Sequence, residues 1–173
     1  MKKTRACGLP FEIKSEPMQR FWLFKSEPNT FSIEDLAKSK GRKTTWEGVR
    51  NYQARNLLRD DVKRGDGVLF YHSNTDPLAI VGTAEVVKPG YPDHFAWQAD
   101  HKYFDDASSP EKPVWYMVDI KLVTIFEQPV TRAMLAEHPV TSQMMVMKRG
   151  SRLSIQPVTA EGWQAVHELA GIV

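Results

Sequence analysis

The chain has 173 residues, of which 42% are hydrophobic and 25% are charged, and its formal net charge is +2. These values are typical of a globular protein with one hydrophobic core, and so small a net charge does not by itself indicate a polyanionic partner. The chain has no run of about 18 apolar residues, so we expect no membrane-spanning helix and no membrane partner.

The N-terminal part has a basic start and one cysteine. Cys7 is the single cysteine, so no disulfide can form within the chain, which fits the reducing cytosol. The basic start is not followed by the apolar segment of a secretory signal. We therefore expect a cytoplasmic protein. Residues 1–18 lack periodicity and are predicted to be a disordered tail, followed by a single domain over residues 19–173.

The first half of this domain predicts strands and short helices. Residues 21–25 form an apolar run typical of a central strand. Ser32 is placed as an N-cap, with Asp35 as its capping-box partner, and predicts a short helix. Asn51 is a second N-cap candidate, for a helix that runs to about Arg59.

The second half is richer in strands. Apolar runs predict further strands over residues 68–73, 79–88 and 152–157, and a two-residue alternation predicts the longest strand, over residues 114–126. Thr131 is an N-cap candidate for a third helix, and residues 159–170 predict a final one. Residues 89–113 have no periodicity, and a loop of this length is often functional or lid-like. Strands interrupted by short helices predict a small α+β barrel and not a doubly wound parallel sheet.

Residues 46–56 (WEGVRNYQARN) have an unusual composition for a structural segment. They combine an indole, a phenol, side-chain amides and two guanidinium groups with only two aliphatic residues, Val49 and Ala54. Flat rings beside planar hydrogen-bonding groups suit a flat polar ligand such as a nucleobase. Gly48 would let the backbone approach that ligand closely. The same composition also fits a surface loop that enters a helix, so this stretch alone leaves both interpretations open.

The charges are unevenly distributed along the chain. Residues 38–64 carry nine Lys or Arg against three acids, whereas residues 93–111 carry five acids against one Lys. A basic face over the first segment would suit phosphate groups. A solvated helix face is the alternative explanation.

The sequence shows no signature of a metal site or of a common catalytic motif. The five histidines lack the spacing of metal ligands, and one cysteine excludes a zinc knuckle. No phosphate-binding glycine loop and no GxSxG motif are present. We therefore expect no metal and no cofactor.

Five motifs in order resemble the EVE domain family: WLFKSEP at 22–28, WEGVRNYQARN at 46–56, FYHS at 70–73, WYMVD at 115–119 and SIQP at 154–157. The resemblance covers about residues 20–171. It implies a PUA-like fold, a small mixed β-barrel of five to six strands with short helices around it, akin to the YTH readers of methylated adenine. It also implies a nucleic-acid-binding module that holds a modified base of DNA or RNA, such as a modified cytosine, in an aromatic pocket.

The resemblance also implies which residues form the site. By motif, the base pocket would contain Lys25, Ser26, Trp46, Val49, Asn51, Phe70, Tyr71, Ser154 and Gln156. Arg50 and Arg55 are expected at its mouth, as contacts to phosphates. The leading hypothesis is a monomeric, non-enzymatic reader of nucleic acid. The alternative is an enzyme acting on a nucleotide or a small polar substrate, with His72 or Asp119 as acid–base groups.

Overall fold

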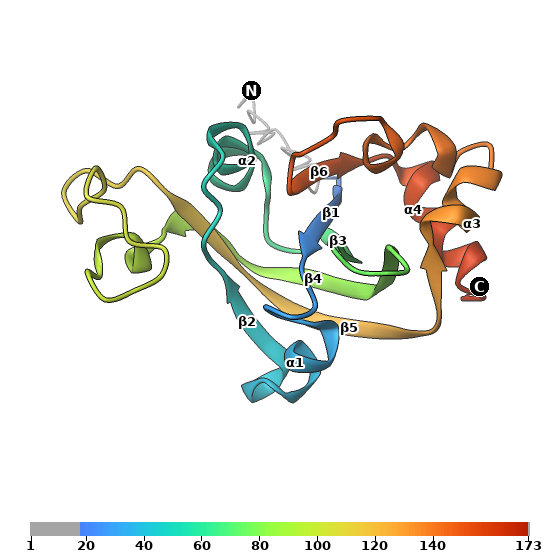
Figure 1. Cartoon of the computed structure of the whole chain (residues 1–173), viewed down its shortest axis with the longest axis horizontal. Coiled ribbons are helices and arrows are strands. Elements are labelled where there is room, and N and C mark those ends of the chain that lie inside the picture. Colours follow the sequence, from blue (N-terminus) through green and yellow to red (C-terminus); the bar gives the residue numbers. More distant parts are fainter. Residues whose placement is uncertain (1–17, 173) are drawn as a thin grey trace, which may run out of the picture.

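A six-stranded mixed sheet forms the centre of the computed structural model, which describes residues 18–172 (Figure 1). Cys7 and nearly all of the predicted tail lie outside the described residues. The sheet has the order β2-β5-β4-β3-β1-β6. Its strands are β1 (Phe21–Ser26), β2 (Lys43–Trp46), β3 (Gly67–His72), β4 (Ala79–Pro92), β5 (Tyr116–Thr131) and β6 (Ile155–Val158). The β1–β3 pairing is parallel, and the other pairings within residues 18–172 are antiparallel.

Four short α-helices accompany the sheet within the described part of the chain: α1 (Ile33–Lys38), α2 (Tyr52–Asn56), α3 (Arg132–Glu137) and α4 (Ala160–Leu169). Each begins after an N-cap whose side chain accepts a backbone N–H, and the predicted N-caps Ser32, Asn51 and Thr131 are confirmed. A π-helical turn, Leu57–Asp61, continues α2 slightly beyond the predicted end at Arg59. None of the described helices is long and apolar enough to cross a membrane.

The five predicted strands agree in position with β1, β3, β4, β5 and β6 but differ from them in length, whereas β2, which ends at Trp46, was not predicted from the sequence. The central placement of β1 is confirmed, because it pairs with both β3 and β6. Strand β4 extends to Pro92 and takes the first residues of the predicted loop, and β5 begins at Tyr116 and ends at Thr131. Register shifts interrupt the β4–β5 ladder at several points, and each shift breaks the two-residue periodicity on which the prediction relied.

The sheet curls so that strands far apart in the ladder share one core. The Trp46 ring on β2 lies 5.3 Å from the Phe24 ring on β1 and 5.5 Å from the Phe70 ring on β3, measured between centroids. Within residues 18–172, hydrogen-bonded pairing runs from β2 to β6 without closing into a ring. The structure thus confirms the mixed sheet with short helices and shows it as a curled sheet.

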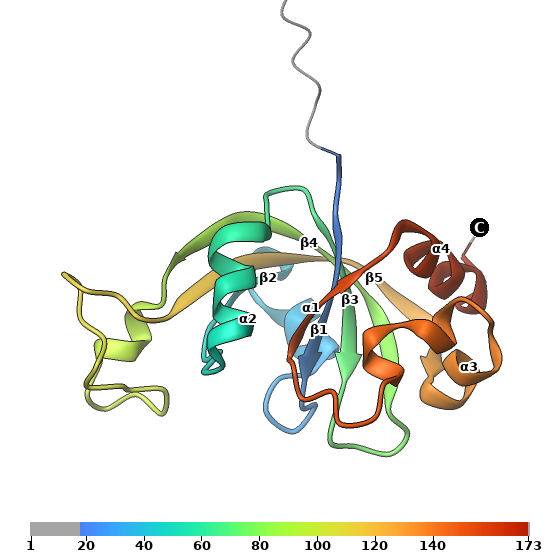
Figure 2. The same ribbon diagram turned by 90° about the horizontal axis from the view of Figure 1, so that it is seen from above.

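Each face of the sheet carries its own hydrophobic cluster. The inner face holds Phe24, Trp46 and Phe70 together with residues of α1 and α2. The outer face carries a second cluster, which includes Tyr71 and is covered by α3 and α4. Figure 2 shows α3 and α4 at the opposite end of the molecule from the long loop between β4 and β5. Among the described residues, neither α3 nor α4 contributes to the inner-face cluster.

Candidate nucleic-acid interface

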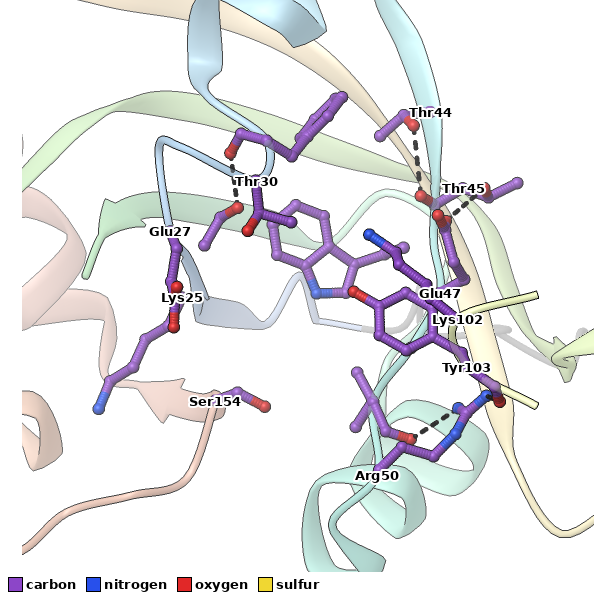
Figure 3. A pocket seen from close by; sticks show the side chains of 15 residues that line it. Lys25, Glu27, Thr30, Thr44, Thr45, Glu47, Arg50, Lys102, Tyr103 and Ser154 are labelled. Atoms are coloured by element: carbon purple, nitrogen blue, oxygen red, sulfur yellow. Dashed lines mark hydrogen bonds between the residues drawn. The ribbon is translucent and has the colours of Figure 1, made fainter. Parts of the chain in front are cut away.

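A cavity of about 430 Å³ lies beside Trp46 (Figure 3). This volume is within the range of pockets that hold small ligands. Six of the residues expected at the site line it: Lys25, Ser26, Trp46, Val49, Arg50 and Ser154. The other lining residues are Glu27, Thr30, Phe31, Thr44, Thr45, Glu47, Gly48, Lys102 and Tyr103.

Trp46 forms an aromatic wall that the core holds in place. Its side chain is 8% exposed, and the rings of Phe24 and Phe70 pack against it. Phe70 itself is fully buried and does not line the cavity, so it supports the wall from behind. A ring held by two others has lost its rotational freedom before any ligand arrives, which lowers the entropic cost of stacking.

The loop that follows β4 is tied to the segment after Trp46 and lines one side of the cavity. We call residues 93–115 the strap. Asp93 is fully buried, and its Oδ2 atom accepts hydrogen bonds from the Gly48 N–H (3.1 Å) and from Arg50 Nη1 (2.9 Å). Arg50 Nη2 donates in turn to the carbonyl oxygen of Tyr103. The Asp93–Arg50 ion pair therefore fixes the strap to the segment that follows Trp46.

The strap adds two cavity residues, Lys102 and Tyr103, that the sequence did not indicate. The Tyr103 ring lies directly against Gly48, where a Cβ atom would overlap it. Gly48 also has φ +79°, a conformation that favours glycine. The proposed close approach at Gly48 is thus made by a ring of the protein itself. In the sequence, only the length of the loop over residues 89–113 pointed to this role. That length indicated a lid but did not indicate which side chains would line the cavity.

The polar side of the cavity is formed by the end of β1 and the chain before β6. Ser26 Oγ donates to the Phe31 carbonyl oxygen (2.6 Å), and the Lys25 N–H donates to the Ser154 carbonyl oxygen (2.9 Å). Among residues 18–172, the Ser154 hydroxyl has no hydrogen-bond partner. Figure 3 shows the Lys25 ammonium pointing away from the cavity centre, and its Nζ donates to the Ser151 carbonyl oxygen (3.0 Å).

Two carboxylates, Glu27 and Glu47, line the cavity and were not among the expected residues. Glu47 Oε2 accepts a hydrogen bond from Thr45 Oγ1 (2.7 Å), which orients that carboxylate. Carboxylates accept hydrogen bonds from the exocyclic amino groups of bases and repel phosphates. The lining is therefore better suited to the edge of a base than to a phosphate group.

Four of the expected pocket residues lie elsewhere: Asn51, Phe70, Tyr71 and Gln156 do not line this cavity. Asn51 Oδ1 accepts the Ala54 N–H (3.0 Å) and caps α2. Gln156 is 1% exposed and donates to Ser151 Oγ (3.0 Å) and to the Leu153 carbonyl oxygen (2.8 Å), so it shapes the chain before Ser154. Tyr71 lies on the outer face of the sheet.

Arg50 and Arg55 use their guanidinium groups within the protein. The Arg50 guanidinium lies 5.5 Å from the Tyr103 ring and 5.3 Å from the Trp115 ring. Arg55 lies over Tyr52 (5.1 Å) and donates to the Val114 carbonyl oxygen. Both arginines thus hold the strap against α2, in addition to any contact with a ligand.

His72 and Asp119, the acid–base candidates of the enzyme alternative, each have partners within the protein. His72 Nε2 accepts the Ile33 N–H at the start of α1 (3.2 Å), and burial lowers the pKa of His72. Asp119 accepts the Tyr91 hydroxyl and lies 3.9 Å from Lys43 Nζ. Neither residue lines the cavity. Within the described part of the chain, no group of three or more His, Cys, Asp or Glu could hold a metal ion.

Comparisons with known proteins match nearly the whole described chain. The EVE domain model matches residues 20–169. Human thymocyte nuclear protein 1 is 39% identical over 164 residues, covering 86% of this chain and 72% of the relative. A crystal structure of a Pseudomonas syringae protein is 43% identical, with a TM-score of 0.81, and covers 87% of this chain and 99% of that protein.

Two further solved structures contain nucleic acid. Human THYN1 protein, in complex with 5-methylcytosine containing DNA, is 37% identical with a TM-score of 0.81, and covers 88% of this chain and 98% of that chain. The YTH domain of Zygosaccharomyces rouxii MRB1, in complex with N6-methyladenosine RNA, is 18% identical with a TM-score of 0.52, and covers 95% of each chain. At this low identity, the YTH similarity concerns the fold alone.

Proposed function

This chain belongs to the EVE domain family, and on that premise we propose that it is a nucleic-acid-binding module that holds one modified base in the cavity beside Trp46. The observation that carries the proposal is the cavity with its braced aromatic wall, in a chain 37% identical to a protein seen with 5-methylcytosine containing DNA. DNA with 5-methylcytosine is therefore the first ligand to test.

Stacking on Trp46 supplies the energy for taking a base out of its helix. Extruding a base costs a few kcal/mol of stacking and pairing, and stacking on one aromatic side chain restores roughly 1–3 kcal/mol. The immobilised Trp46 ring can recover most of that cost. Tyr103, on the strap, supplies a second ring at the same cavity.

Selectivity for the base comes from the edges of the cavity. Glu27 and Glu47 offer carboxylates to an exocyclic amino group such as N4 of cytosine, and the Ser154 hydroxyl offers a further hydrogen bond. Val49 offers an apolar contact for a methyl group. Burying one methyl group contributes about 0.8 kcal/mol, so we expect the preference for the modified base to be modest.

The remaining expectations complete this proposal. Three expected residues would act by positioning others. Asn51 would hold the start of α2, Phe70 would support the Trp46 ring, and Gln156 would shape the chain before Ser154. The curled sheet would correspond to the barrel of the PUA-like fold, since β2 packs across its interior against β1. The module would act as a monomer and by binding alone, without chemistry on the base.

A crystal soaked with 5-methyl-2′-deoxycytidine tests the proposal. We expect the base to stack on Trp46, with its amino group directed to Glu27 or Glu47. A parallel soak with 2′-deoxycytidine at the same concentration is the control and should show lower occupancy. A base bound outside this cavity, or equal occupancy of the two nucleosides, would contradict the proposal.

A further inference from the structure

A second cavity, of about 410 Å³, adjoins the first and shares Lys25 with it. Its lining includes no acidic residue, in contrast to the first cavity with its two glutamates. Five cationic residues line it: Lys25, Arg132, Lys148, Arg149 and Arg152. None of these five forms an ion pair with another residue in the range 18–172.

Hydrogen bonds hold the positive charge in place from two sides. Arg132, at the start of α3, donates to the carbonyl oxygens of Val146 (2.6 Å) and Met147 (3.3 Å). On the other side, Lys25 Nζ donates to the Ser151 carbonyl oxygen (3.0 Å). The segment between Met147 and Ser151 therefore spans the gap between two fixed cations, and it carries the exposed Lys148 and Arg149.

The charges of Lys25 and Arg132 lie close enough together to interact unfavourably. Burial lowers the pKa of Lys25, and the nearby charge of Arg132 lowers it further. Both effects disfavour the ammonium form, and an anion between the two cations would reverse the second. Tyr71 and Ser73 also line this cavity and offer hydroxyl groups, which commonly contact phosphate oxygens.

We propose that this second cavity binds a backbone phosphate of the strand whose base occupies the first cavity. The proposal rests on the proposed function, because the shared Lys25 places the two cavities side by side for one nucleotide and its phosphate. It also accounts for the distribution of arginines. Arg50 and Arg55 are engaged in holding the strap, whereas Arg149 and Arg152 are exposed beside the cavity.

The test replaces the two exposed arginines together, as Arg149→Gln with Arg152→Gln. Its matched control, Lys40→Gln with Lys121→Gln, removes the same charge from exposed positions that line neither cavity. The affinity for a DNA duplex with one 5-methylcytosine is measured at several salt concentrations for the parent and both double variants. Each phosphate contact contributes about 0.9 to the slope of log affinity against log salt concentration.

We expect the arginine variant to have a slope smaller in magnitude by about 1–2, so that between about 50 and 200 mM salt the parent loses roughly tenfold more affinity than the variant. The control should keep the parent slope. The affinity for free 5-methyl-2′-deoxycytidine, which has no phosphate, should be the same in the arginine variant and the parent.

An arginine variant with the parent slope, or with a change no larger than that of the control, would overturn the assignment of the second cavity. If instead the proposed recognition of the modified base is wrong, the measurements would differ in another way. The parent would then bind methylated and unmethylated duplexes equally, while the salt slope of the arginine variant would still decide whether the second cavity binds phosphate.

Discussion

The indole of Trp46 and the ring of Phe24 lie 5.3 Å apart between centroids, although three strands separate β2 from β1 in the sheet. The wall of the proposed base site is thus also a contact that holds the curl of the sheet together. Ligand binding and folding therefore depend on the same side chain, and the two contributions must be separated by the choice of substitution.

Trp46→Ala should reduce stability as well as binding. Removing a buried tryptophan side chain typically costs about 3–5 kcal/mol, and we expect a loss of this size in urea unfolding. Trp46→Phe keeps a ring against Phe24 and Phe70 and should lose less stability while still weakening stacking. Equal unfolding midpoints for Trp46→Ala and the parent would show that this ring does not support the core.

Gly48→Ala should loosen the strap. The new Cβ would overlap the Tyr103 ring, and the positive φ of +79° adds about 1–2 kcal/mol of backbone strain. Gly41→Ala is a matched control, because Gly41 has φ +68° with no atom near its Cβ position. Hydrogen exchange should become faster in residues 93–115 only in the Gly48 variant. Equal exchange in the two variants would argue against the Tyr103 contact.

Asp93→Ala should destabilise the protein by roughly 3–5 kcal/mol, toward the lower end because the Arg50 side chain is 24% exposed. The substitution leaves Arg50 without its partner charge and the Gly48 N–H without its acceptor. Urea unfolding provides the measurement. Asp60→Ala is the comparison, since it breaks an exposed pair with Arg59 and should leave the midpoint nearly unchanged. Similar midpoints for both variants would contradict a structural role for Asp93.

His72 should make stability depend on pH in the mildly acidic range. Burial lowers its pKa below the ordinary value of 6.5, and the nearby charge of Glu34 only partly opposes this. The unfolded chain therefore takes up a proton at a higher pH than the folded chain, so stability falls as the pH drops below about 6.5. The neutral ring is also needed because Nε2 accepts the Ile33 N–H.

Urea unfolding between about pH 7.5 and pH 5 measures this effect. His72→Gln should show a smaller decrease in stability over that range than the parent. An identical decrease in both proteins would assign the pH dependence to other groups.

Features set by neighbouring residues could be predicted from the sequence. The N-cap at Ser32 depends on Asp35, three residues away, and the N-cap at Asn51 on the Ala54 N–H. Opposite faces for Phe70 and Tyr71 follow from the strand period, and the two residues do belong to different hydrophobic clusters. Such contacts depend on a few residues, and their spacing is fixed by helix or strand geometry.

Contacts between distant segments could not be predicted in this way. Asp93 reaches Arg50 across 43 residues, and the Tyr103 ring covers Gly48 from within a loop that has no periodicity. Glu27 and Glu47 stand in motifs that carried the family resemblance, yet only the curl of the sheet brings both to one cavity. The second cavity also depends on contacts between distant segments, because Lys25 of β1 and Arg132 of α3 both line it.

The most direct test of the central claim compares two DNA duplexes that differ by one methyl group, cytosine against 5-methylcytosine, titrated at one fixed salt concentration. The parent should bind the methylated duplex about fourfold more tightly, as expected for one buried methyl group at about 0.8 kcal/mol. Trp46→Phe should bind both duplexes more weakly than the parent. Equal affinities of the parent for the two duplexes, or unchanged binding by Trp46→Phe, would contradict the assignment of this cavity to a modified base.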